Sequence, residues 1–292
     1  MKNAIVLGFP DYSEQGSNLA VALDTRYAEV NVHHFPDGEC KLTLPTDLPR
    51  HIVVCRSLHE PNSKLIELYL LANALRSQHC EKLTLVAPYL CYMRQDKAFS
   101  PGEVISQQWI GQFLGALYDE VITVDPHLHR VNNIELVIHT RRASALSASR
   151  LIGDYIAQKL KAPVIMGPDE ESLQWVKRVA EPYGFEFCVA QKTRKTDSDV
   201  SINLPDINLR HRDIVLVDDV ASTGNTLFET ATLLAAQAPS SIFCAITHAL
   251  FVEEAYPRLM GLGVKDVWST DSISHISNKI SLATLLADDI IL

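Results

Sequence analysis

Short runs of β-branched and other apolar residues recur along this chain, separated by longer segments with apolar positions at helical spacing. In the first half, the runs predict strands at Ala4–Leu7, His51–Cys55, Leu83–Ala87 and Glu120–Val124, and the segment Ser63–Arg76 predicts a helix. Strands that alternate with helices are typical of largely parallel sheets covered on both faces. The predicted fold class is therefore α/β.

The second half repeats this pattern. Its predicted strands are Pro163–Met166, Glu186–Ala190, Asp213–Val217, Ile242–Thr247 and Asp266–Ser269, and its predicted helices include Ser172–Glu181 and Thr226–Ala236. A chain of 292 residues is long enough for two domains. We expect domains at residues 1–145 and 146–292, divided near Ala145 in the weakly patterned segment His139–Ser149, with the final helix free to pack back on the first domain.

Composition limits the classes of function. The net charge is -9 and the basic residues form no block, so we expect neither nucleic acid nor an anionic membrane as a partner. The six cysteines lack metal-site spacing and are expected to be reduced thiols. The apolar run at the N-terminus is too short for a signal peptide, and no segment approaches the roughly 18 apolar residues of a membrane span. We therefore expect a cytoplasmic protein.

The strongest local signal is IVLVDDVASTGNTL at residues 214–227, an apolar strand followed by paired acids, a small polar turn and a helix. Free backbone N–H groups at such a helix start bind phosphate. Ser222–Thr226 would hold the phosphate, while Asp218 and Asp219 would accept hydrogen bonds from sugar hydroxyls. The same residue types also form ordinary helix N-caps, but the complete pattern favours a sugar phosphate site.

Two segments of the first half combine turn and charged residues. HFPDGE spans residues 34–39 and YMRQDK spans residues 92–97. Taken singly, the first is favourable turn chemistry and the second a solvated charged loop. Together they permit an aromatic ring to stack on a nucleobase, with carboxylates and cations for its amino group, ribose and phosphates.

Three further segments place polar side chains after predicted strands. His127 and His129 follow the strand of VITVDPHLHR, Asp169 follows the strand of VIMGPDEES, and Lys192 and Arg194 lie in QKTRKTDSD. Without other information, His127 is a structural strand-end histidine or part of a transition-metal pair, because Mg²⁺ prefers oxygen ligands. Asp169 alone suits a helix N-cap, and the cations alone suit solvated surface.

The motif VLVDD with its Thr-Gly-x-Thr turn resembles the ribose-phosphate loop of type I phosphoribosyltransferases and of ribose-phosphate diphosphokinases. HFPDGE and YMRQDK resemble ATP-site segments of the diphosphokinases, which simple phosphoribosyltransferases lack. The resemblance implies two phosphoribosyltransferase-like domains with mostly parallel sheets, related by a pseudo-twofold. It implies Mg²⁺-dependent transfer of diphosphate from ATP to ribose 5-phosphate, and a homodimer or larger homo-oligomer with its ATP site at a subunit interface.

Carried over residue by residue, the resemblance assigns four groups. The catalytic residues are Lys192 and Arg194, and the metal residues are His127 and Asp169. The ATP-binding residues are Phe35, Asp37, Gly38, Glu39, Arg94, Gln95 and Asp96. The residues for ribose 5-phosphate are Arg194, Asp218, Asp219, Ser222, Thr223, Gly224, Asn225 and Thr226.

The sequence departs from the commonest bacterial pattern at Glu170, Glu171, Ser222 and Asn225, and looks closer to the archaeal-type branch. Asn225 tolerates a left-handed backbone, so the turn can survive. Three alternatives remain open: a non-catalytic regulatory paralogue, a phosphoribosyltransferase, and a relative with another sugar phosphate or nucleotide donor. A regulatory paralogue would be expected to lose Lys192, Asp169 or His127.

Overall fold

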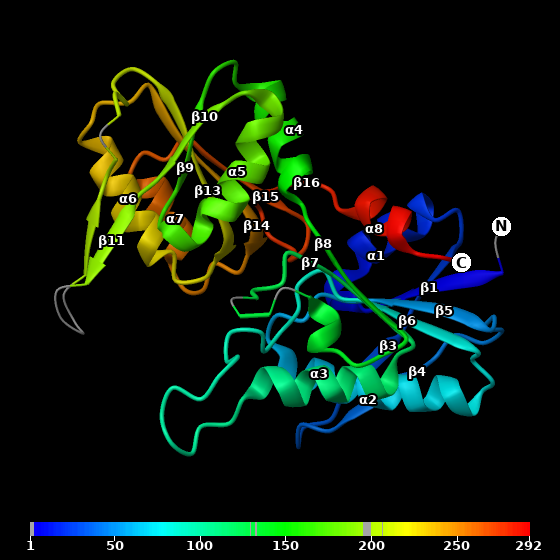
Figure 1. Cartoon of the computed structure of the whole chain (residues 1–292). Helices are drawn as coiled ribbons and strands as arrows, with labels where there is room; N and C mark the ends of the chain where they lie inside the picture. The colour runs from blue at the N-terminus through cyan, green and yellow to red at the C-terminus, as the bar shows by residue number, and fades with distance from the viewer. Residues whose placement is uncertain (1–2, 129, 132, 195–199, 206) are drawn as a thin grey trace. The chain divides into compact units, whose positions relative to one another are not determined.

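The computed structural model describes residues 3–128, 130–131, 133–194, 200–205 and 207–292. It consists of two compact units (Figure 1). The first comprises Met1–Ser147, Ser272–Ser274 and Leu282–Leu292, and the second comprises Ala148–Asp271 and His275–Ser281. The final helix α8 (Ala283–Asp289) thus belongs to the first unit, where it packs on α1 (Ser13–Ala22).

The first unit contains a six-stranded sheet in the order β2-β1-β5-β6-β7-β8. All its neighbouring strands run parallel. Its strands are β1 (Ala4–Gly8), β2 (Arg26–Glu29), β5 (His51–Cys55), β6 (Lys82–Val86), β7 (Glu120–Val124) and β8 (Arg142–Leu146). Helices α2 (Pro61–Ser77) and α3 (Ser106–Leu117) cover one face, and α1 with α8 covers the other (Figure 1).

The second unit repeats this arrangement in the order β10-β9-β13-β14-β15-β16, again with parallel neighbours. Its strands are β9 (Val164–Gly167), β10 (Glu186–Val189), β13 (Asp213–Ala221), β14 (Ser241–Ala249), β15 (Asp266–Thr270) and β16 (Asn278–Ile280). Helices α4 (Ser149–Lys159) and α5 (Leu173–Ala180) pack together, as do α6 (Asn225–Ala235) and α7 (Ala255–Gly261).

Each unit also carries a separate antiparallel hairpin. The first consists of β3 (Asn31–His34) and β4 (Cys40–Thr43), and the second of β11 (Gln191–Arg194) and β12 (Val200–Asn203). Both hairpins follow the edge strand of their sheet and precede the strand that lies third in its order. The two units therefore share a topology that includes the hairpin.

Burial explains why these segments form sheets. Strands β1 and β7 are buried at every position, as expected for parallel strands covered on both faces. Leu68, Leu71 and Leu75 of α2 have no exposed surface and belong to the first core cluster. The burial of each of these side chains adds about 1.5–3 kcal/mol to the stability of the folded state. In the second core cluster, Leu227 and Leu234 of α6 pack with the apolar side chains of β13 and β14.

The structure confirms the predicted α/β class and the nine predicted strands, with ends that differ mainly by one residue. The longest addition is in β13, which continues through the two aspartates to Ala221. The sequence pattern did not predict β2, β8, β16 or the hairpin strands, which are short and carry many polar or small residues. β8 lies within the weakly patterned segment His139–Ser149.

Among the described residues, no helix combines the length and apolar character needed to cross a membrane.

Candidate active site

The second unit presents a strand, a turn and a helix at the carboxyl edge of its sheet. β13 is buried up to Val217, and the turn after Ala221 leads directly into α6. Gly224 precedes the helix with φ +67°, a left-handed conformation that favours glycine, and its carbonyl accepts the N–H of Phe228 at 2.7 Å. The first N–H groups of α6 have no intrahelical acceptors and meet the positive end of the helix dipole. This is a structure suited to a phosphate group.

Carboxylates gather beside this turn. Asp219 is 4% exposed, and Asp218 is partly buried with its Oδ1 accepting the backbone N–H of Asp219 at 3.0 Å. Burial, together with the charges of Asp219 and Asp169, raises the pKa of Asp218 well above its usual value. The pKa shift indicates a site that repels a further negative charge and would favour a cation or hydroxyl donors.

Asp169 follows β9, the sheet neighbour of β13. Its Oδ1 accepts the N–H groups of Glu171 at 3.1 Å and Ser172 at 3.2 Å, so the N-cap interpretation holds. These two hydrogen bonds hold the carboxylate of Asp169 at the carboxyl edge of the sheet. A carboxylate fixed in this way can cap the helix and also face a ligand. Gly167 makes the cap possible, because a Cβ there would lie 2.0 Å from Ser172 Oγ.

The turn between β13 and α6 is held in place by the chain after β14. Val252 N–H donates to the carbonyl of Ser222 at 3.2 Å, and Phe251 N–H donates to that of Ala221 at 2.8 Å. At the helix start, Arg258 Nη1 approaches Asn225 Oδ1 at 3.4 Å. Asn225 is one of the departures from the bacterial pattern, so α7 contacts the residue that distinguishes this turn.

Lys192 and Arg194 have their backbones in β11, paired with Ile202 and Val200. The hairpin begins directly after β10, and Ala190 N–H donates to the carbonyl of Gly167 at 2.9 Å. The hairpin therefore starts beside the strand that carries Asp169. The side chains of Lys192 and Arg194, and residues 195–199 of the expected catalytic loop, lie outside the described part of the chain.

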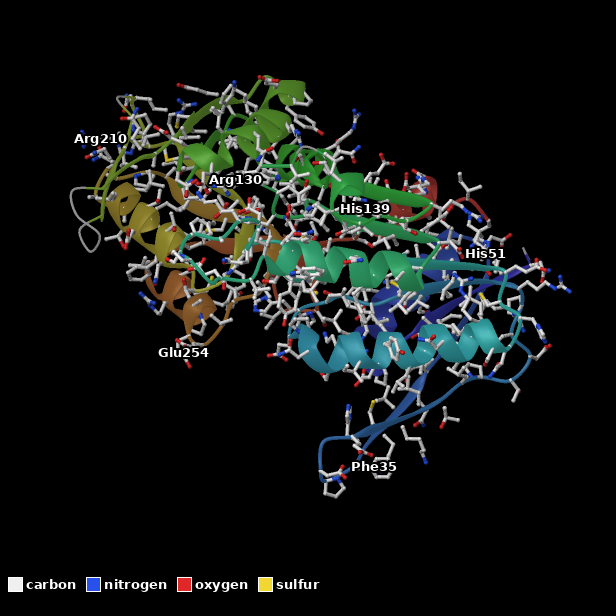
Figure 2. All side chains as sticks on the ribbon, turned by 60° about the horizontal axis from the view of Figure 1, so that its bottom comes forward. Phe35, His51, Arg130, His139, Arg210 and Glu254 are labelled. Atoms are coloured by element: carbon white, nitrogen blue, oxygen red, sulfur yellow. The ribbon has the colours of Figure 1, made fainter. Side chains whose placement is uncertain are left out.

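In the first unit, Phe35–Glu39 form the tip of the β3–β4 hairpin. Phe35 N–H donates to the Glu39 carbonyl at 2.8 Å, and Gly38 adopts φ +93°. Phe35 is 41% exposed and packs edge-on against His33, with ring centroids 4.7 Å apart. Figure 2 shows Phe35 at the end of a hairpin that projects beyond α2. An aromatic ring in this position is available for stacking.

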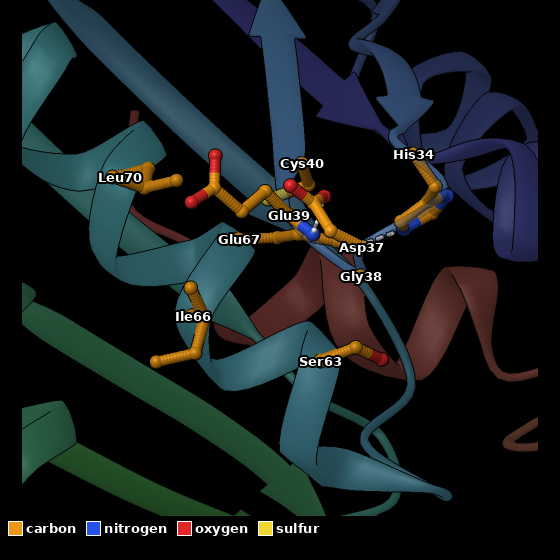
Figure 3. A pocket seen from close by; sticks show the side chains of 9 residues that line it. All are labelled: His34, Asp37, Gly38, Glu39, Cys40, Ser63, Ile66, Glu67 and Leu70. Atoms are coloured by element: carbon orange, nitrogen blue, oxygen red, sulfur yellow. Dashed lines mark hydrogen bonds and ion pairs between the residues drawn. The ribbon is translucent and has the colours of Figure 1, made fainter.

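A cavity of about 520 Å³ lies between this hairpin and α2 (Figure 3). It is lined by His34, Asp37, Gly38, Glu39, Cys40, Ser63, Ile66, Glu67 and Leu70. Three predicted ATP-site residues therefore share one cavity wall. Phe35 is not among the residues that line this cavity, and neither are Arg94, Gln95 and Asp96.

The segment around Arg94 is held by its neighbours. Arg94 is exposed, while Gln95 Nε2 donates to Glu103 Oε2 at 3.0 Å. Arg130 Nη1 contacts both oxygens of Asp96, at 2.7 and 2.8 Å, and the Asp96 side chain is 1% exposed. Asp96, which we expected at ATP, thus ties its segment to the loop that carries His127.

His127 lies just beyond β7 and is half-buried. The preceding Asp125 has φ +36°, and its N–H donates to the Leu146 carbonyl at 2.8 Å. The positive φ of Asp125 is a strained conformation. Together with the hydrogen bond to Leu146 of β8, it fixes the start of the loop that carries His127. His129 lies outside the described residues. Within the described ranges, no three His, Cys, Asp or Glu side chains lie close enough to hold a metal ion by themselves.

Sequence reasoning missed a set of buried charges in the first unit. Arg56 is 5% exposed, Lys64 6% and Glu67 1%. Arg56 forms ion pairs with Glu67 and Asp11, and Lys64 forms one with Asp11. The available signal was a charged residue inside each apolar run, namely VVCRS at the end of a strand and LIELYLL within a helix. Charged residues are seldom fully buried unless they are paired.

Comparison with known proteins agrees with this geometry. The profile of the N-terminal domain of ribose phosphate pyrophosphokinase matches residues 6–117, and that of the phosphoribosyl transferase domain matches residues 137–281. The ribose-phosphate pyrophosphokinase of Methanopyrus kandleri is 32% identical over 97% of both chains. That of Methanosarcina acetivorans is 32% identical over 97% of this chain and 98% of its own.

Ribose-phosphate pyrophosphokinase 2 of Archaeoglobus fulgidus is 34% identical over 88% of this chain and 89% of its own. In fold, the chain resembles the crystal structure of phosphoribosylpyrophosphate synthetase from Mycobacterium smegmatis, with a TM-score of 0.85 and 22% identity over 98% of this chain and 97% of that one. The similarity to the curated relatives extends over nearly the entire length of each chain. The protein therefore belongs to the ribose-phosphate pyrophosphokinase family of enzymes.

Proposed function

We propose that this protein is a ribose-phosphate diphosphokinase, the activity for which its relatives are named. It would transfer the diphosphoryl group of ATP to O1 of ribose 5-phosphate and release AMP, giving 5-phosphoribosyl 1-diphosphate. The observation that carries the proposal is the β13–α6 turn with Asp218, Asp219 and Asp169 beside it. This arrangement suits a phosphorylated sugar in a chain that belongs to this family.

Ribose 5-phosphate would bind with its phosphate on the N–H groups of Ser222–Thr226 and its hydroxyls on Asp218 and Asp219. The free N–H groups at the start of α6 support the phosphate position. Ionised carboxylates make strong hydrogen bonds with hydroxyl donors, and hydroxyl donors would compensate the crowded charges that raise the pKa of Asp218. Arg194 is assigned to the same substrate by family resemblance.

The residues also fit Mg²⁺. The ion commonly binds one or two carboxylates, retains waters and takes further oxygens from substrate phosphates, so a cluster of three protein ligands is not required. The carboxylate of Asp169, whose charge acts on Asp218, is a suitable donor, and resemblance adds His127. Bound Mg²⁺ would neutralise part of the phosphate charge as the transfer proceeds.

The transfer itself needs a nucleophile and stabilisation of phosphate charge. O1 of the sugar would attack the β-phosphorus of ATP, and the bond from that phosphorus to the oxygen of the AMP leaving group would break. Lys192 and Arg194 would stabilise the charge on the phosphate oxygens. Lys192→Ala should lower turnover by about 100-fold and the two KM values by far less, whereas Lys177→Ala, at an exposed lysine of α5, should leave both unchanged.

ATP would use the β3–β4 hairpin and the segment around Arg94. Phe35 is exposed and free to stack on adenine, and Asp37 and Glu39 offer acceptors for its amino group or the ribose. Arg94 is exposed for a contact with the ring or the phosphates. The family resemblance implies that a second subunit completes this ATP site.

An exposed apolar surface supports a homo-oligomer. Ile66, Tyr69 and Leu70 of α2 are 56%, 46% and 41% exposed, and Trp109 of α3 is 57% exposed. Tyr69 stacks on Phe113 of α3, which makes the surface continuous across the two helices. Contiguous exposed apolar side chains are typical of interaction surfaces. We propose that this surface meets a second copy of the chain.

The deciding assay measures AMP formation by the purified protein with ATP, Mg²⁺ and ribose 5-phosphate. AMP that depends on both the sugar and Lys192 would support the proposal. ATP binding without AMP formation would favour a regulatory paralogue instead. Diphosphate release from 5-phosphoribosyl 1-diphosphate that requires a nucleobase would favour a phosphoribosyltransferase.

A further inference from the structure

A chain of ion pairs, buried except at Asp11, lies in the first unit at the carboxyl edge of its sheet. Arg56, just after β5, contacts Glu67 of α2 at 2.5 Å on one side and Asp11 at 3.1 Å on the other. Lys64 Nζ contacts Asp11 at 2.9 Å and donates to the Ser57 carbonyl at 3.0 Å. The Arg56 guanidinium also lies 3.9 Å above the ring centre of Phe9. These contacts hold Glu67 in one position.

The second oxygen of Glu67 reaches the ATP-site hairpin. Glu67 Oε1 lies 2.9 Å from His34 Nε2, and His34 is the last residue of β3, directly before Phe35 (Figure 3). The Glu67 side chain is 2% exposed, whereas that of His34 is 59% exposed. A hydrogen bond therefore links a fixed, buried carboxylate to a residue adjoining the hairpin tip.

The hairpin needs such a link. β3 and β4 form a two-stranded sheet of their own, outside the six-stranded sheet. An isolated two-stranded hairpin is marginally stable at best in water, so its direction depends on contacts with the rest of the unit. Val32 and Leu42 supply apolar packing against the core. Among the described contacts of residues 34–39, the bond to Glu67 is the polar link to α2.

Because the two units share a topology, this network can be compared with the same sheet edge of the second unit. Asp11 follows β1 as Asp169 follows β9, and Arg56 follows β5, the counterpart of β13. In the second unit this edge carries crowded carboxylates suited to ligands. In the first, burial alone would raise the pKa of Asp11, but Arg56 and Lys64 outweigh it and lower that pKa. In the first unit, the part of the edge after β1 and β5 is thus occupied by the unit's own paired charges.

We infer that Glu67 is a positioning residue, which holds the Phe35–Glu39 tip through His34 in the orientation that receives ATP. The inference rests on the proposed function of the hairpin. Glu67 does not contact the nucleotide in this scheme. The ion pairs with Arg56 prevent the carboxylate from turning away, and His34 transmits its position to the backbone beside Phe35.

The test uses His34 because its removal leaves the buried Arg56–Glu67 pair intact. The full-length protein would be compared with His34→Ala, His34→Gln and Lys41→Ala, the last removing an exposed side chain from the same hairpin. Kinetics with ATP, Mg²⁺ and ribose 5-phosphate give KM for each substrate and kcat. Amide hydrogen exchange of residues 31–43 without ligands reports the hairpin directly.

We expect His34→Ala to raise KM for ATP about tenfold, as for loss of a hydrogen bond to a charged group. KM for ribose 5-phosphate should change less than about twofold, with hairpin exchange accelerated. In His34→Gln, the amide can still donate to Glu67, so KM for ATP and hairpin exchange should both return close to their wild-type values. Lys41→Ala should change neither.

Unchanged hairpin exchange in His34→Ala would overturn the anchoring, whatever the activity of the protein. Accelerated exchange with an unchanged KM for ATP would overturn the positioning role. If the unaltered protein forms no AMP, the proposed function fails by itself, and direct ATP titration of the same variants decides the inference: equal affinities would overturn it, and weaker binding by His34→Ala would support it.

Discussion

Replacing Asp218 with asparagine should stabilise the unliganded protein while weakening its binding of sugar phosphate. The carboxyl is partly buried and lies near the charges of Asp219 and Asp169, and its pKa is raised well above the usual value for these reasons. Asparagine has the same shape as aspartate and retains a side-chain oxygen. That oxygen can accept the backbone N–H of Asp219, which lies 3.0 Å from Oδ1 of Asp218 in the wild type. The substitution therefore removes the unfavourable charge and little else.

The size of the expected gain in stability depends on how far the Asp218 carboxyl is buried. A fully buried, unpaired charge costs several kcal/mol, but water screens part of the repulsion at a partly exposed carboxyl, so we expect a gain of about 1 kcal/mol. For a chain of this size that corresponds to about 2–4 °C in Tm. Because the folded-state pKa is raised, the wild type loses stability as pH rises from the ordinary value of 3.8 through the raised pKa. The gain of the variant therefore grows as the pH rises above 3.8 toward the raised pKa, and it disappears toward pH 3.8.

Thermal unfolding of the wild type and Asp218→Asn, measured from pH 7.5 downward, tests this expectation. Asp213→Asn is the matched control, because it removes the same charge from the opposite end of β13. KM for ribose 5-phosphate should rise about tenfold in Asp218→Asn, as for loss of a charged hydrogen bond. The reasoning would be refuted by a variant that is no more stable at neutral pH, or by a gain that does not change with pH.

Three other experiments test separate parts of the structure. Gly167→Ala should lower the free energy of unfolding by about 2 kcal/mol or more in a denaturant titration, because its Cβ would lie 2.0 Å from Ser172 Oγ. Gly261→Ala is the control, because a Cβ there meets no atom within 4 Å and should leave the free energy of unfolding nearly unchanged. Phe35→Ala should raise KM for ATP several-fold at unchanged Tm, since the ring is 41% exposed; an unchanged KM would argue against stacking. Tyr69→Lys with Trp109→Lys should lower the mass seen by light scattering, while Val21→Lys, at a more exposed apolar site of α1, should not. Identical masses would exclude the α2–α3 surface.

The sequence was informative where burial and periodicity coincide. Strands such as His51–Cys55 and Glu120–Val124 are covered on both faces, so their apolar runs mark them with the bounds that the structure has. The short strand β8, with the sequence RASAL, has only one fully buried position and gives no such signal. The hairpin strands are stabilised by their partner and by contacts with distant residues, which a local pattern does not contain.

The candidate site could be predicted as segments but not as contacts. The β13–α6 turn is local in sequence, so its strand, turn and helix were predictable from one stretch of residues. The bond between Asp96 and Arg130 spans 34 residues and assigns Asp96 a partner that its own motif does not suggest. The link from His34 to Glu67 likewise joins residues 33 positions apart. Such pairs depend on the fold, which brings loops from different strands to one edge.

The two halves of the chain show how one topology acquires different chemistry at the same edge. In the second unit, a short turn at the start of α6 leaves backbone N–H groups and carboxylates available to a ligand. In the first, the helix after the corresponding strand supplies Lys64 and Glu67, whose ion pairs with Asp11 and Arg56 occupy the edge. Because buried charges are stable only when paired, this filling commits the first unit to an internal network. The proposed ATP contacts of the first unit therefore lie outside this network, at the hairpin tip and in the segment around Arg94.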